Sequence, residues 1–566
     1  MTNGILVECV PNFSEGRDRG VIDQITREIE QVEGVLLLDV DAGKATNRTV
    51  VTLVGPPEAV LEAAVRSARK ACELIDMRGH HGEHPRFGAM DVCPLVPVSG
   101  ITLTETAQWA HKLAKRLAGE VGMTVYCYEA AATSPRRKNL AEVRAGEYEG
   151  LAAKLALPDW EPDYGPAEFN ARSGATAVGA RDFLVAYNVN LNTTSTRRAN
   201  AIAFDVREKG RELREGGALS GKILRDGHGE PLWQAGTLKA TKAIGWFIEE
   251  YGIAQVSMNL TDSGVTPLHV AFDEVCARAA DRGVRVTGSE LVGVVPLRAM
   301  LDAGRYFLEK QQRSVGVADA ELVKIAVRSL GLADLTPFDP SEKIIEYAIA
   351  KRQVAQKSLQ SLTVRGFIEE TASESAAPGG GSVAALLGAL AAALGTMVAN
   401  LSSHRRGWDE RWREFSDHAN AGKQLHARLG QLVDEDTRAF DAIMAALGMP
   451  KGSDAEKQKR STLLHDATLN AIAIPLQTMR VAAQTYDLLE AMARSGNTAS
   501  ISDVGVGVLC ATAAVRGAHL NVRINAGGLK NPGEVAAMLA EANELAQFAA
   551  RRELAVLALV EAKLGA

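Results

Sequence analysis

The stretch AAPGGGSVAALLGALAAALGTMVANLSS, residues 376–403, runs for 28 residues without a charged side chain. Its length makes it a candidate membrane span. However, it consists mostly of Ala and Gly, which contribute little to membrane insertion, and Pro378, Thr396 and Asn400 interrupt it. We therefore expect a buried helix that packs closely against its neighbours.

This stretch lies where the pattern of the whole chain changes. From residue 358 to residue 566 the sequence is typical of long helices only, and its apolar spacing predicts them at 417–449, 454–495 and 531–564. The polar segment AKRQVAQK at 350–357 comes just before and is predicted to be a linker. Residues 358–566 are therefore expected to form an all-α domain.

Before the linker, strand-like and helix-like segments alternate, which is typical of α/β domains. In residues 1–182 the predicted strands lie at 5–10, 35–40, 49–54, 92–98 and 124–128, and the predicted helices at 21–32, 58–75 and 104–121. In residues 183–349 the predicted strands lie at 183–191, 254–260 and 290–295, and the helices at 196–208 and 267–282. Residues 210–241 are rich in Gly and charge, lack periodicity and are expected to form an exposed excursion. The predicted fold is multidomain, with two α/β subdomains whose sheets are covered by helices, followed by the all-α domain.

The composition narrows the possible functions. A length of 566 residues corresponds to roughly three to four domains. Lys and Arg number 63 against 69 Asp and Glu, and a net charge of −6 disfavours nucleic acid and anionic membranes as partners. The six cysteines are scattered without a CxxC pair, and the N-terminus shows no secretion signal. Reduced thiols and a cytoplasmic location are therefore expected.

Three histidines, His80, His81 and His84, lie in the segment RGHHGEHPRFGAMDVCPLVP at 78–97. A zinc site is one interpretation, but the helix that HExxH-type ligands need is broken here by glycines and a proline. Pro85 favours an extended His84 that projects from a loop, and imidazole suits proton transfer at neutral pH, so His84 is also a candidate catalytic base. Solvated, inactive histidines are the third interpretation, and these residues alone leave all three open.

Two further segments of the α/β part carry candidate binding groups. Asp39 and Asp41 end a predicted strand and Asn47-Arg48 opens the next, so they either line an α/β site or form a capped loop with a surface ion pair. The segment GPAEFNARSGATAVGAR at 165–181 is rich in Gly, which lets a flat ligand approach the backbone. It does not match the GxGxxG pattern, and we expect it to line a crevice between the subdomains.

In the helical part, Gly379, Gly380, Gly381 and Ser382 stand directly before a predicted helix. The free N–H groups of that helix N-terminus could bind an anion or a polar ligand. The alternative is that Ser382 only caps the helix.

Asp436 interrupts the apolar stripe of its predicted helix. Position 436 falls on this stripe by the i, i+3, i+4 rule, whereas Asp434 lies off it and could pair with Arg438. A buried carboxylate costs free energy unless it is partnered, and its pKa should rise, which suits an acid-base catalyst. A structural acid that caps or bridges another helix is the alternative. The apolar members of the stripe are Leu425, Leu429, Leu432, Val433, Phe440, Ile443, Met444 and Leu447.

Several long motifs together resemble a known family. VECVPNFSEG (7–16), LLDVDAGKATNRTVVTLVG (37–55), GEHPRFGAMDVCPLVPV (82–98) and GATAVGAR (174–181) resemble glutamate formimidoyltransferases. SAAPGGGSVAALLGALAAALG (375–395), LVDEDTRAFDAIM (432–444) and RSGNTASISDVGVG (494–507) resemble formimidoyltetrahydrofolate cyclodeaminases. Their order and the linker resemble the fused formimidoyltransferase-cyclodeaminase family over essentially the whole chain. Residues 210–241 depart from it, being longer than in the animal enzymes.

The resemblance implies a transferase module over 1–182 and 183–349 and a cyclodeaminase domain over 358–566. It implies His84 as the transferase histidine and Asp436, the second Asp of the VDxD motif, as the cyclodeaminase aspartate. Charge and position alone suggest Asp39, Arg48 and Arg86 as supporting residues, with Asp39 orienting the imidazole and the arginines holding a substrate carboxylate. The implied folate-contacting segment comprises Gly165, Pro166, Ala167, Glu168, Phe169, Asn170, Ala171, Arg172, Ser173 and Gly174.

The implied substrates are N-formimidoyl-L-glutamate and tetrahydrofolate, the latter in polyglutamylated form, with no metal. The implied products are glutamate, then 5,10-methenyltetrahydrofolate and ammonia. Homo-oligomers built from dimers are expected as well. Two alternatives stay open for the helical domain, a methenyltetrahydrofolate cyclohydrolase and a module that only oligomerises.

Overall fold

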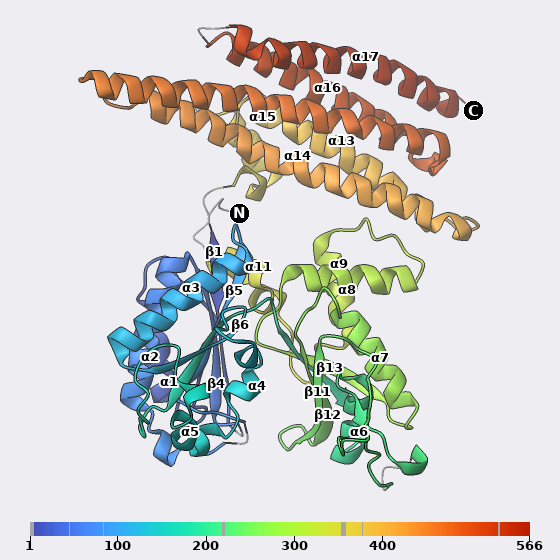
Figure 1. The fold of residues 1–566 in the computed structure, drawn as a ribbon. Helices are drawn as coiled ribbons and strands as arrows, with labels where there is room; N and C mark the ends of the chain where they lie inside the picture. Colours follow the sequence, from blue (N-terminus) through green and yellow to red (C-terminus); the bar gives the residue numbers. More distant parts are fainter. Residues whose placement is uncertain are drawn as a thin grey trace. The chain divides into compact units, whose positions relative to one another are not determined.

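The structure is a computed structural model that describes residues 5–44, 46–82, 84–217, 221–352, 358–375, 377–529 and 532–565. By its internal contacts the chain divides into two units. The first comprises residues 1–303 and 323–354 and contains two subdomains, each with its own main sheet. The second comprises residues 304–322 and 355–566 and is helical. The predicted fold class is confirmed (Figure 1).

The first sheet has seven strands. β1 (Leu6–Cys9) and β2 (Asn12–Phe13) follow one another between β4 (Arg48–Gly55) and β5 (Met90–Ser99), antiparallel to both. β3 (Leu36–Gly43) pairs antiparallel with the other side of β4, while β7 (Ala175–Ala180) and then β6 (Thr124–Glu129) continue from β5 in parallel. The strands predicted in residues 1–182 are thereby confirmed.

One face of this sheet is covered by α1 (Arg19–Glu30), α2 (Pro57–Leu74) and α3 (Leu103–Arg116) (Figure 1). Strand residues such as Val7, Cys9 and Leu53 point to these helices and form one hydrophobic core with them. Because successive strand residues point to opposite faces, Glu8 lies on the other face of the sheet. Polar side chains on that opposite face, which these three helices do not cover, are therefore available to line a functional site.

The strand β7 corrects one expectation. Residues 175–180 were expected to line a crevice as a Gly-rich loop, yet they form a strand whose six residues are all buried between β5 and β6. Gly179 explains the composition, because a Cβ there would lie 2.5 Å from the ring of Tyr128. Small residues in this segment therefore serve close packing inside the sheet.

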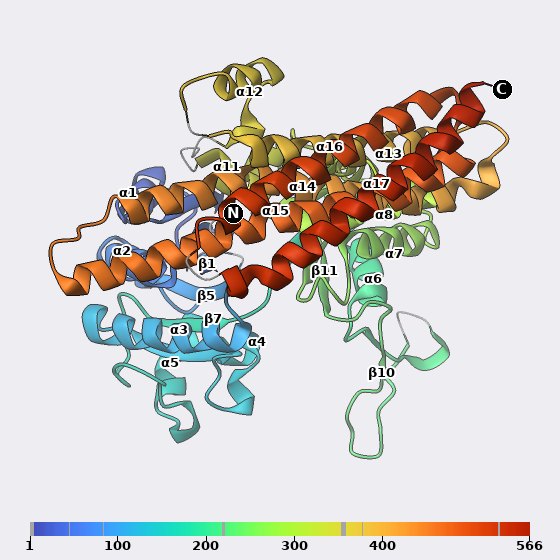
Figure 2. The same cartoon turned by 90° about the horizontal axis from the view of Figure 1, so that it is seen from above.

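The second sheet is antiparallel and has the order β11-β12-β8-β13. Its strands are β8 (Val185–Leu191), β11 (Thr241–Ile248), β12 (Ile253–Leu260) and β13 (Val286–Val292), and it carries α6 (Thr196–Val206) and α7 (Leu268–Ala280). The expected strand at 290–295 thus begins and ends earlier. The excursion contains β9 (Arg211–Glu212) and β10 (Trp233–Gln234), which pair with one another and extend away from α6 in Figure 2. Residues 218–220 of the excursion lie outside the described residues.

The two subdomains are joined by the last elements of the first unit, α10 (Pro340–Lys343) and α11 (Ile345–Arg352). Ile345 and Ala348 of α11 pack with Leu38 of β3 and Val54 of β4 in one small hydrophobic cluster. Residues 350–352 of the expected linker are therefore helical, and residues 353–357 lie outside the described residues.

The helical unit is a bundle. Its helices are α12 (Val364–Thr371), α13 (Gly380–Ser403), α14 (Trp412–Leu447), α15 (Asp454–Ser495), α16 (Ile501–Ala526) and α17 (Ala536–Leu564). The uncharged stretch forms α13, which contacts α14, α15 and α16. A Cβ at Gly388 would lie 3.0 Å from Leu429 and 3.4 Å from both Ala482 and Ala514, so this glycine permits three helices to approach α13 closely.

Two segments of the bundle, Gly380–Ser403 and Thr498–Ala526, are long and apolar enough to cross a membrane. In each, 56% of the most apolar window is buried inside the structure. Core helices of a bundle have the same length and composition, so these two properties alone do not indicate a membrane span.

The apolar stripe predicted around Asp436 is buried along only part of α14. Leu429, Leu432 and Val433 are buried, but Phe440 and Met444 are 37% and 51% exposed. Burial along this stripe therefore becomes incomplete from about one turn after Asp436, although Ala446 farther along α14 is buried again.

Replacing Gly422 by Ala should destabilise the bundle, because the new Cβ would lie 2.2 Å from Thr396 Oγ1 and 2.6 Å from Leu488 Cδ2. We expect a loss of about 1–3 kcal/mol in the free energy of unfolding, measured by thermal or denaturant unfolding of the full chain. Gly517→Ala is the matched control, since its Cβ would meet only Ala384 Cβ at 3.3 Å and alanine favours helix. Equal stability of the two variants would contradict the close packing at Gly422.

Candidate active sites

The loop that carries His84 is fixed by hydrogen bonds to the β3–β4 turn. Asn47 donates from Nδ2 to the His81 carbonyl at 3.0 Å, and its carbonyl lies 2.8 Å from His80 Nε2. Gly82 passes so close that a Cβ would lie 2.1 Å from the Thr46 carbonyl oxygen. His80 also accepts a hydrogen bond from Arg86 Nε at 3.3 Å, so both of its ring nitrogens are engaged and it holds the loop.

The imidazole of His84 has a defined tautomer. Its Nδ1 lies 2.7 Å from the Pro85 carbonyl oxygen, which can only accept a hydrogen bond. In the neutral ring Nδ1 therefore carries the proton and Nε2 carries the lone pair. The loop thus presents an imidazole whose Nε2 can take a proton.

A buried carboxylate lies beside this histidine. Asp91 of β5 is fully buried, forms an ion pair with Arg48, and accepts a hydrogen bond from Arg144 Nη1 at 2.8 Å and from the Phe87 N–H at 3.0 Å. Burial alone would raise the pKa of Asp91, but the charges of Arg48 and Arg144 hold it below its usual range. Asp91 is therefore ionised, and it ties together the strands and the α4 (Leu140–Val143) C-terminus that surround His84.

The surroundings of His84 also change its pKa. Burial, and then the positive charges of Arg48 and Arg144, lower the pKa of His84 to about 4. Since this value lies well below neutral pH, the ring is unprotonated at pH 7 and its Nε2 lone pair is available.

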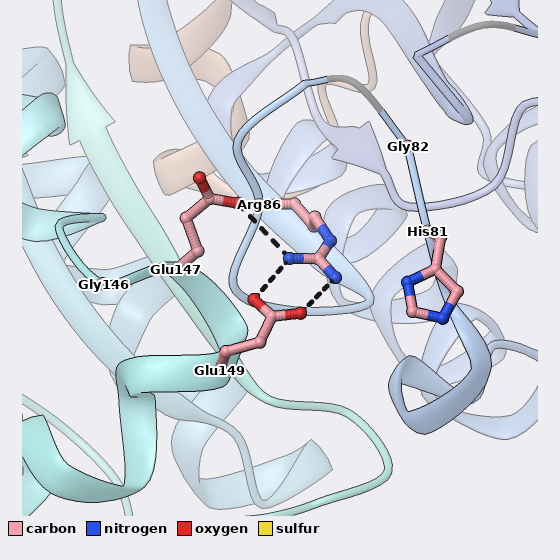
Figure 3. A pocket seen from close by; sticks show the side chains of 6 residues that line it. All are labelled: His81, Gly82, Arg86, Gly146, Glu147 and Glu149. Carbon is pink, nitrogen blue, oxygen red and sulfur yellow. Dashed lines mark hydrogen bonds and ion pairs between the residues drawn. The ribbon is translucent and has the colours of Figure 1, made fainter.

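Arg86 does not face His84. It donates from both terminal nitrogens to Glu149, at 2.8 and 2.7 Å, and lies 3.3 Å from Glu147. Figure 3 shows this group around a pocket of about 420 Å³ that is also lined by His81, Gly82 and Gly146. Because its charge is already balanced by two carboxylates, Arg86 is poorly placed to hold a substrate carboxylate.

Asp39 lies in a second charged group, between the two sheets of the first unit. Its carboxylate is 3.6 Å from Lys343 Nζ, so its charge partner is this lysine, while Asp91 is the carboxylate beside His84. Burial, and next the charge of Asp39, raise the pKa of Asp41, which also faces Lys343 and Glu290. On the same face, burial raises the pKa of Glu8 to about 7. Acids from both subdomains thus line the space between the sheets.

The segment expected to contact folate is a surface loop before β7. Thr124 Oγ1 donates to the Pro166 carbonyl at 2.7 Å, and Asn170 Oδ1 accepts from the N–H groups of Arg172 and Ser173. Phe169 is 37% exposed, and its ring lies 5.5 Å from that of Tyr148. Tyr148 belongs to α5 (Glu147–Leu155) and is half-buried, so the exposed ring of Phe169 on the loop is the one that suits stacking against a flat ring.

In the helical unit, Asp436 lies at the N-terminus of α13. Ser382 Oγ donates to Asp436 Oδ2 at 3.0 Å and also lies 3.2 Å from Thr437 Oγ1. A Cβ at Gly381 would lie 2.1 Å from Asp436 Oδ1, so only glycine leaves room for the carboxylate. The structure therefore brings together Gly381, Ser382 and Asp436, which the sequence had singled out separately.

Burial raises the pKa of Asp436, although its hydrogen bonds with Ser382 oppose the shift. Asp434 behaves differently. It accepts hydrogen bonds from Ser358 Oγ, the Leu359 N–H and Gln360 Nε2 at 2.7–2.9 Å, where a pair with Arg438 had been expected. Asp434 thus fastens the first residues of the unit, and Asp436 is the acid near the helix N-terminus.

Within the part of the chain that the structure describes, no three His, Cys, Asp or Glu side chains are grouped as a metal site. The zinc interpretation of the histidine segment therefore has no ligand set among these residues, since His80 and His84 make the hydrogen bonds given above.

Comparison with known proteins gives the class of these sites. Residues 6–181 match the family model described as "Formiminotransferase domain, N-terminal subdomain", residues 186–350 match "Formiminotransferase domain", and residues 363–544 match "Formiminotransferase-cyclodeaminase". The chain thus combines the domains of a transferase with those of a cyclodeaminase.

Relatives along the whole chain identify the family. The chain is 44% identical over 520 residues to formimidoyltransferase-cyclodeaminase of Mus musculus, covering 92% of each chain. It is 41% identical over 304 residues to glutamate formimidoyltransferase of Streptococcus pyogenes serotype M1 (54% of this chain, 93% of the relative). Over 190 residues it is 38% identical to methenyltetrahydrofolate cyclohydrolase of Methylorubrum extorquens (32% of this chain, 91% of the relative). The chain belongs to the formimidoyltransferase-cyclodeaminase family.

The lowered pKa of His84 can be measured directly. In the free protein the ring should titrate near pH 4, well below the ordinary value of about 6.5, because it is buried beside two arginines. We expect its NMR signals, assigned by their absence from His84→Gln, to stay in the neutral position down to about pH 5. Titration near pH 6.5 in a folded sample would contradict the electrostatic argument.

Proposed function

We propose that the first unit transfers the formimidoyl group of N-formimidoyl-L-glutamate to N5 of tetrahydrofolate at His84. N5 attacks the formimidoyl carbon, His84 Nε2 takes the N5 proton, and the imidazolium returns a proton to the departing glutamate nitrogen. The observation that carries this proposal is the contact of His84 Nδ1 with the Pro85 carbonyl, which leaves Nε2 as the base.

We propose that the segment 165–174 contacts the folate, which the exposed ring of Phe169, packed against Tyr148, supports. Arg48 holds Asp91 and so shapes the site, while Asp39 and Lys343 belong to the charged space between the sheets. Polyglutamylation of the folate rests on the family resemblance, and comparing KM for mono- and polyglutamylated tetrahydrofolate tests it.

In the helical unit, N10 of 5-formimidoyltetrahydrofolate closes onto the same carbon and ammonia leaves, giving 5,10-methenyltetrahydrofolate. Asp436 either protonates the departing nitrogen directly or relays the N10 proton to it. Its raised pKa supports this role because more of the acid form is present near neutral pH. The N–H groups at Gly379 to Ser382 are the proposed binding groups for the ligand at this helix N-terminus.

A second candidate function for the helical unit is hydrolysis of methenyltetrahydrofolate, as the name of the M. extorquens relative states for that protein. Both reactions would use Asp436 and the same carbon. Opening of methenyltetrahydrofolate by the enzyme without formimidoyl substrate would favour the cyclohydrolase.

We also propose a homo-oligomer built from dimers in the cytoplasm. Exposed apolar residues recur on one side of α13 (Leu390, Met397 and Leu401) and of α16 (Val506, Leu509, Leu520 and Ile524), which supports association through these helices. The six cysteines are free thiols, which fits a reducing compartment. Light scattering of the full chain and cell fractionation test the two statements.

The function is tested by incubating the protein with formimidoylglutamate and tetrahydrofolate while following methenyltetrahydrofolate absorbance and ammonia together. His84→Ala should lose both signals by about 10²- to 10⁴-fold, the usual contribution of a general base, and supplied 5-formimidoyltetrahydrofolate should restore ammonia release. Asp436→Asn should keep glutamate release and lose ammonia release. A folded His84→Ala protein with full transfer activity, or an Asp436→Asn protein with normal ammonia release, would refute the respective assignment.

Gly381→Ala should abolish ammonia release and leave formimidoyl transfer intact, because its Cβ would displace the Asp436 carboxylate. Gly380→Ala is the matched control one residue away, where a Cβ would make only ordinary contact with Asn521 at 3.5 Å. Both ammonia release and formimidoyl transfer are measured on each of the two variants. Equal loss in both variants would mean that the helix N-terminus, and not the carboxylate position, is what matters.

A further inference from the structure

Among the residues that the structure describes, the surroundings of His84 contain more positive than negative charge. Arg48 and Arg144 both pair with the single carboxylate of Asp91, which leaves an excess of one positive charge in this described group. The side chain of Arg48 is 8% exposed, that of Arg144 15% and that of Asp91 0%, so water screens this charge poorly. A buried, uncompensated charge costs free energy, and binding an anion would relieve that cost.

Of the two arginines, Arg144 has the free edge. Arg48 uses Nη1 for Asp91 and Nε for the Asn12 side-chain oxygen at 3.1 Å. Arg144 uses Nη1 for both Asp91 and the Pro85 carbonyl, at 2.8 and 3.1 Å, while its Nε is buried with no hydrogen-bond partner among the described residues. A guanidinium held by Nη1 alone in this way keeps unused hydrogen-bonding capacity for a carboxylate.

Arg144 also lies next to the reacting group. The Pro85 carbonyl accepts hydrogen bonds from Arg144 Nη1 and from His84 Nδ1, so one oxygen atom joins the two side chains. An anion on Arg144 would therefore lie beside the imidazole.

We propose that Arg144 binds the α-carboxylate of N-formimidoyl-L-glutamate and thereby places the departing glutamate nitrogen at His84. This inference rests on the proposed transferase function and names the group that recognises its substrate. The carbon of the α-carboxylate is two bonds away from the nitrogen that leaves, whereas the carbon of the γ-carboxylate is four bonds away. Because Arg144 and the imidazole share the Pro85 carbonyl, the shorter link favours the α-carboxylate as the group that lies on Arg144.

The bound anion would also change the base. The charged groups that act on His84 within the described part of the chain are Arg48 of β4, Asp91 of β5 and Arg144, and the phenol of Tyr128 on β6 lies beside both arginines. A carboxylate there cancels the excess positive charge, so the pKa of His84 rises from about 4 when substrate binds. The site would hold a stronger base in the complex than in the free enzyme.

Substrate analogues test the contact without any mutation. In N-formimidoyl-L-isoglutamine the α-carboxylate is an amide, and in N-formimidoyl-L-glutamine the γ-carboxylate is an amide. We expect kcat/KM to fall by about 10- to 100-fold more for the first analogue than for the second, the usual range for losing a charged hydrogen-bonded contact. An equal fall, or a larger fall for the γ-amide, would overturn the assignment of the α-carboxylate.

Variants link this preference to Arg144. Arg144→Gln should lose about 10- to 100-fold in kcat/KM for formimidoylglutamate and show no remaining preference between the two amides, and Arg144→Lys should recover part of both. Arg69→Gln, which removes an exposed guanidinium from α2, is the control and should match the unaltered protein. A folded Arg144→Gln protein that keeps the discrimination would refute the role of Arg144.

The pH profile separates this role from a structural one. In the unaltered protein the acid limb of kcat should lie at higher pH than the acid limb of kcat/KM, because kcat reports the substrate complex and kcat/KM the free enzyme. In Arg144→Gln the two limbs should converge. If His84→Ala is fully active, the proposed function fails; if His84→Ala is inactive but the limbs coincide in the unaltered protein, only the present inference fails.

Discussion

The transferase site depends on one buried carboxylate, Asp91. It joins β4 through Arg48, the α4 C-terminus through Arg144 and the histidine loop through the Phe87 N–H. Because a buried ion must be paired, the three segments can fold correctly only together, and His84 is fixed at the point where they meet. Burial, and then the charges of the same two arginines, lower the pKa of the imidazole and keep it neutral. One ion-pair group thus determines both the shape of the site and the protonation of its base.

Most of the fold could be predicted from the periodicity of the chain. The α15 helix begins and ends where the apolar pattern predicts, and its N-terminus is a capping box of Ser453 and Glu456. Strand β7 was missed because Gly and Ala carry no strand signal, and its position depends on the Tyr128 ring that packs over Gly179. The exposed end of α14 was missed for the opposite reason, since Phe440 and Met444 continue an apolar pattern beyond the bundle core. The local sequence pattern indicates which secondary structure a segment favours, but it does not show which other segments bury it.

The candidate sites were predictable to a similar extent. Asp436 was recognisable as a carboxylate on an apolar stripe, and the structure adds the contacts with Ser382 and Gly381, which are more than 50 residues away in sequence. Arg144 could not be recognised as a site residue from the sequence, because it lies in a short polar segment. Its role becomes visible only through its contacts with Asp91 and Pro85. Charge and position suggested Arg86 and Asp39, but Glu149 and Lys343 already pair with them. Electrostatic partners are long-range contacts that spacing along the chain does not encode.

The residues 304–322 that group with the helical unit have a consequence for dissecting the protein. Ser314 Oγ donates to Asn400 Oδ1 at 2.6 Å, the Val315 N–H donates to Ser416 Oγ at 3.1 Å, and Gly316 lies against Ala419 of α14. A fragment cut at the linker would lose this segment and uncover polar atoms of α13 and α14 that it now satisfies. Cleavage at residue 357 would therefore yield a helical fragment that exposes the surface which residues 304–322 normally cover. Such a fragment would tend to aggregate, and its loss of activity would say nothing about the catalytic residues. Adding residues 304–322 as a separate peptide should cover this surface of the fragment again.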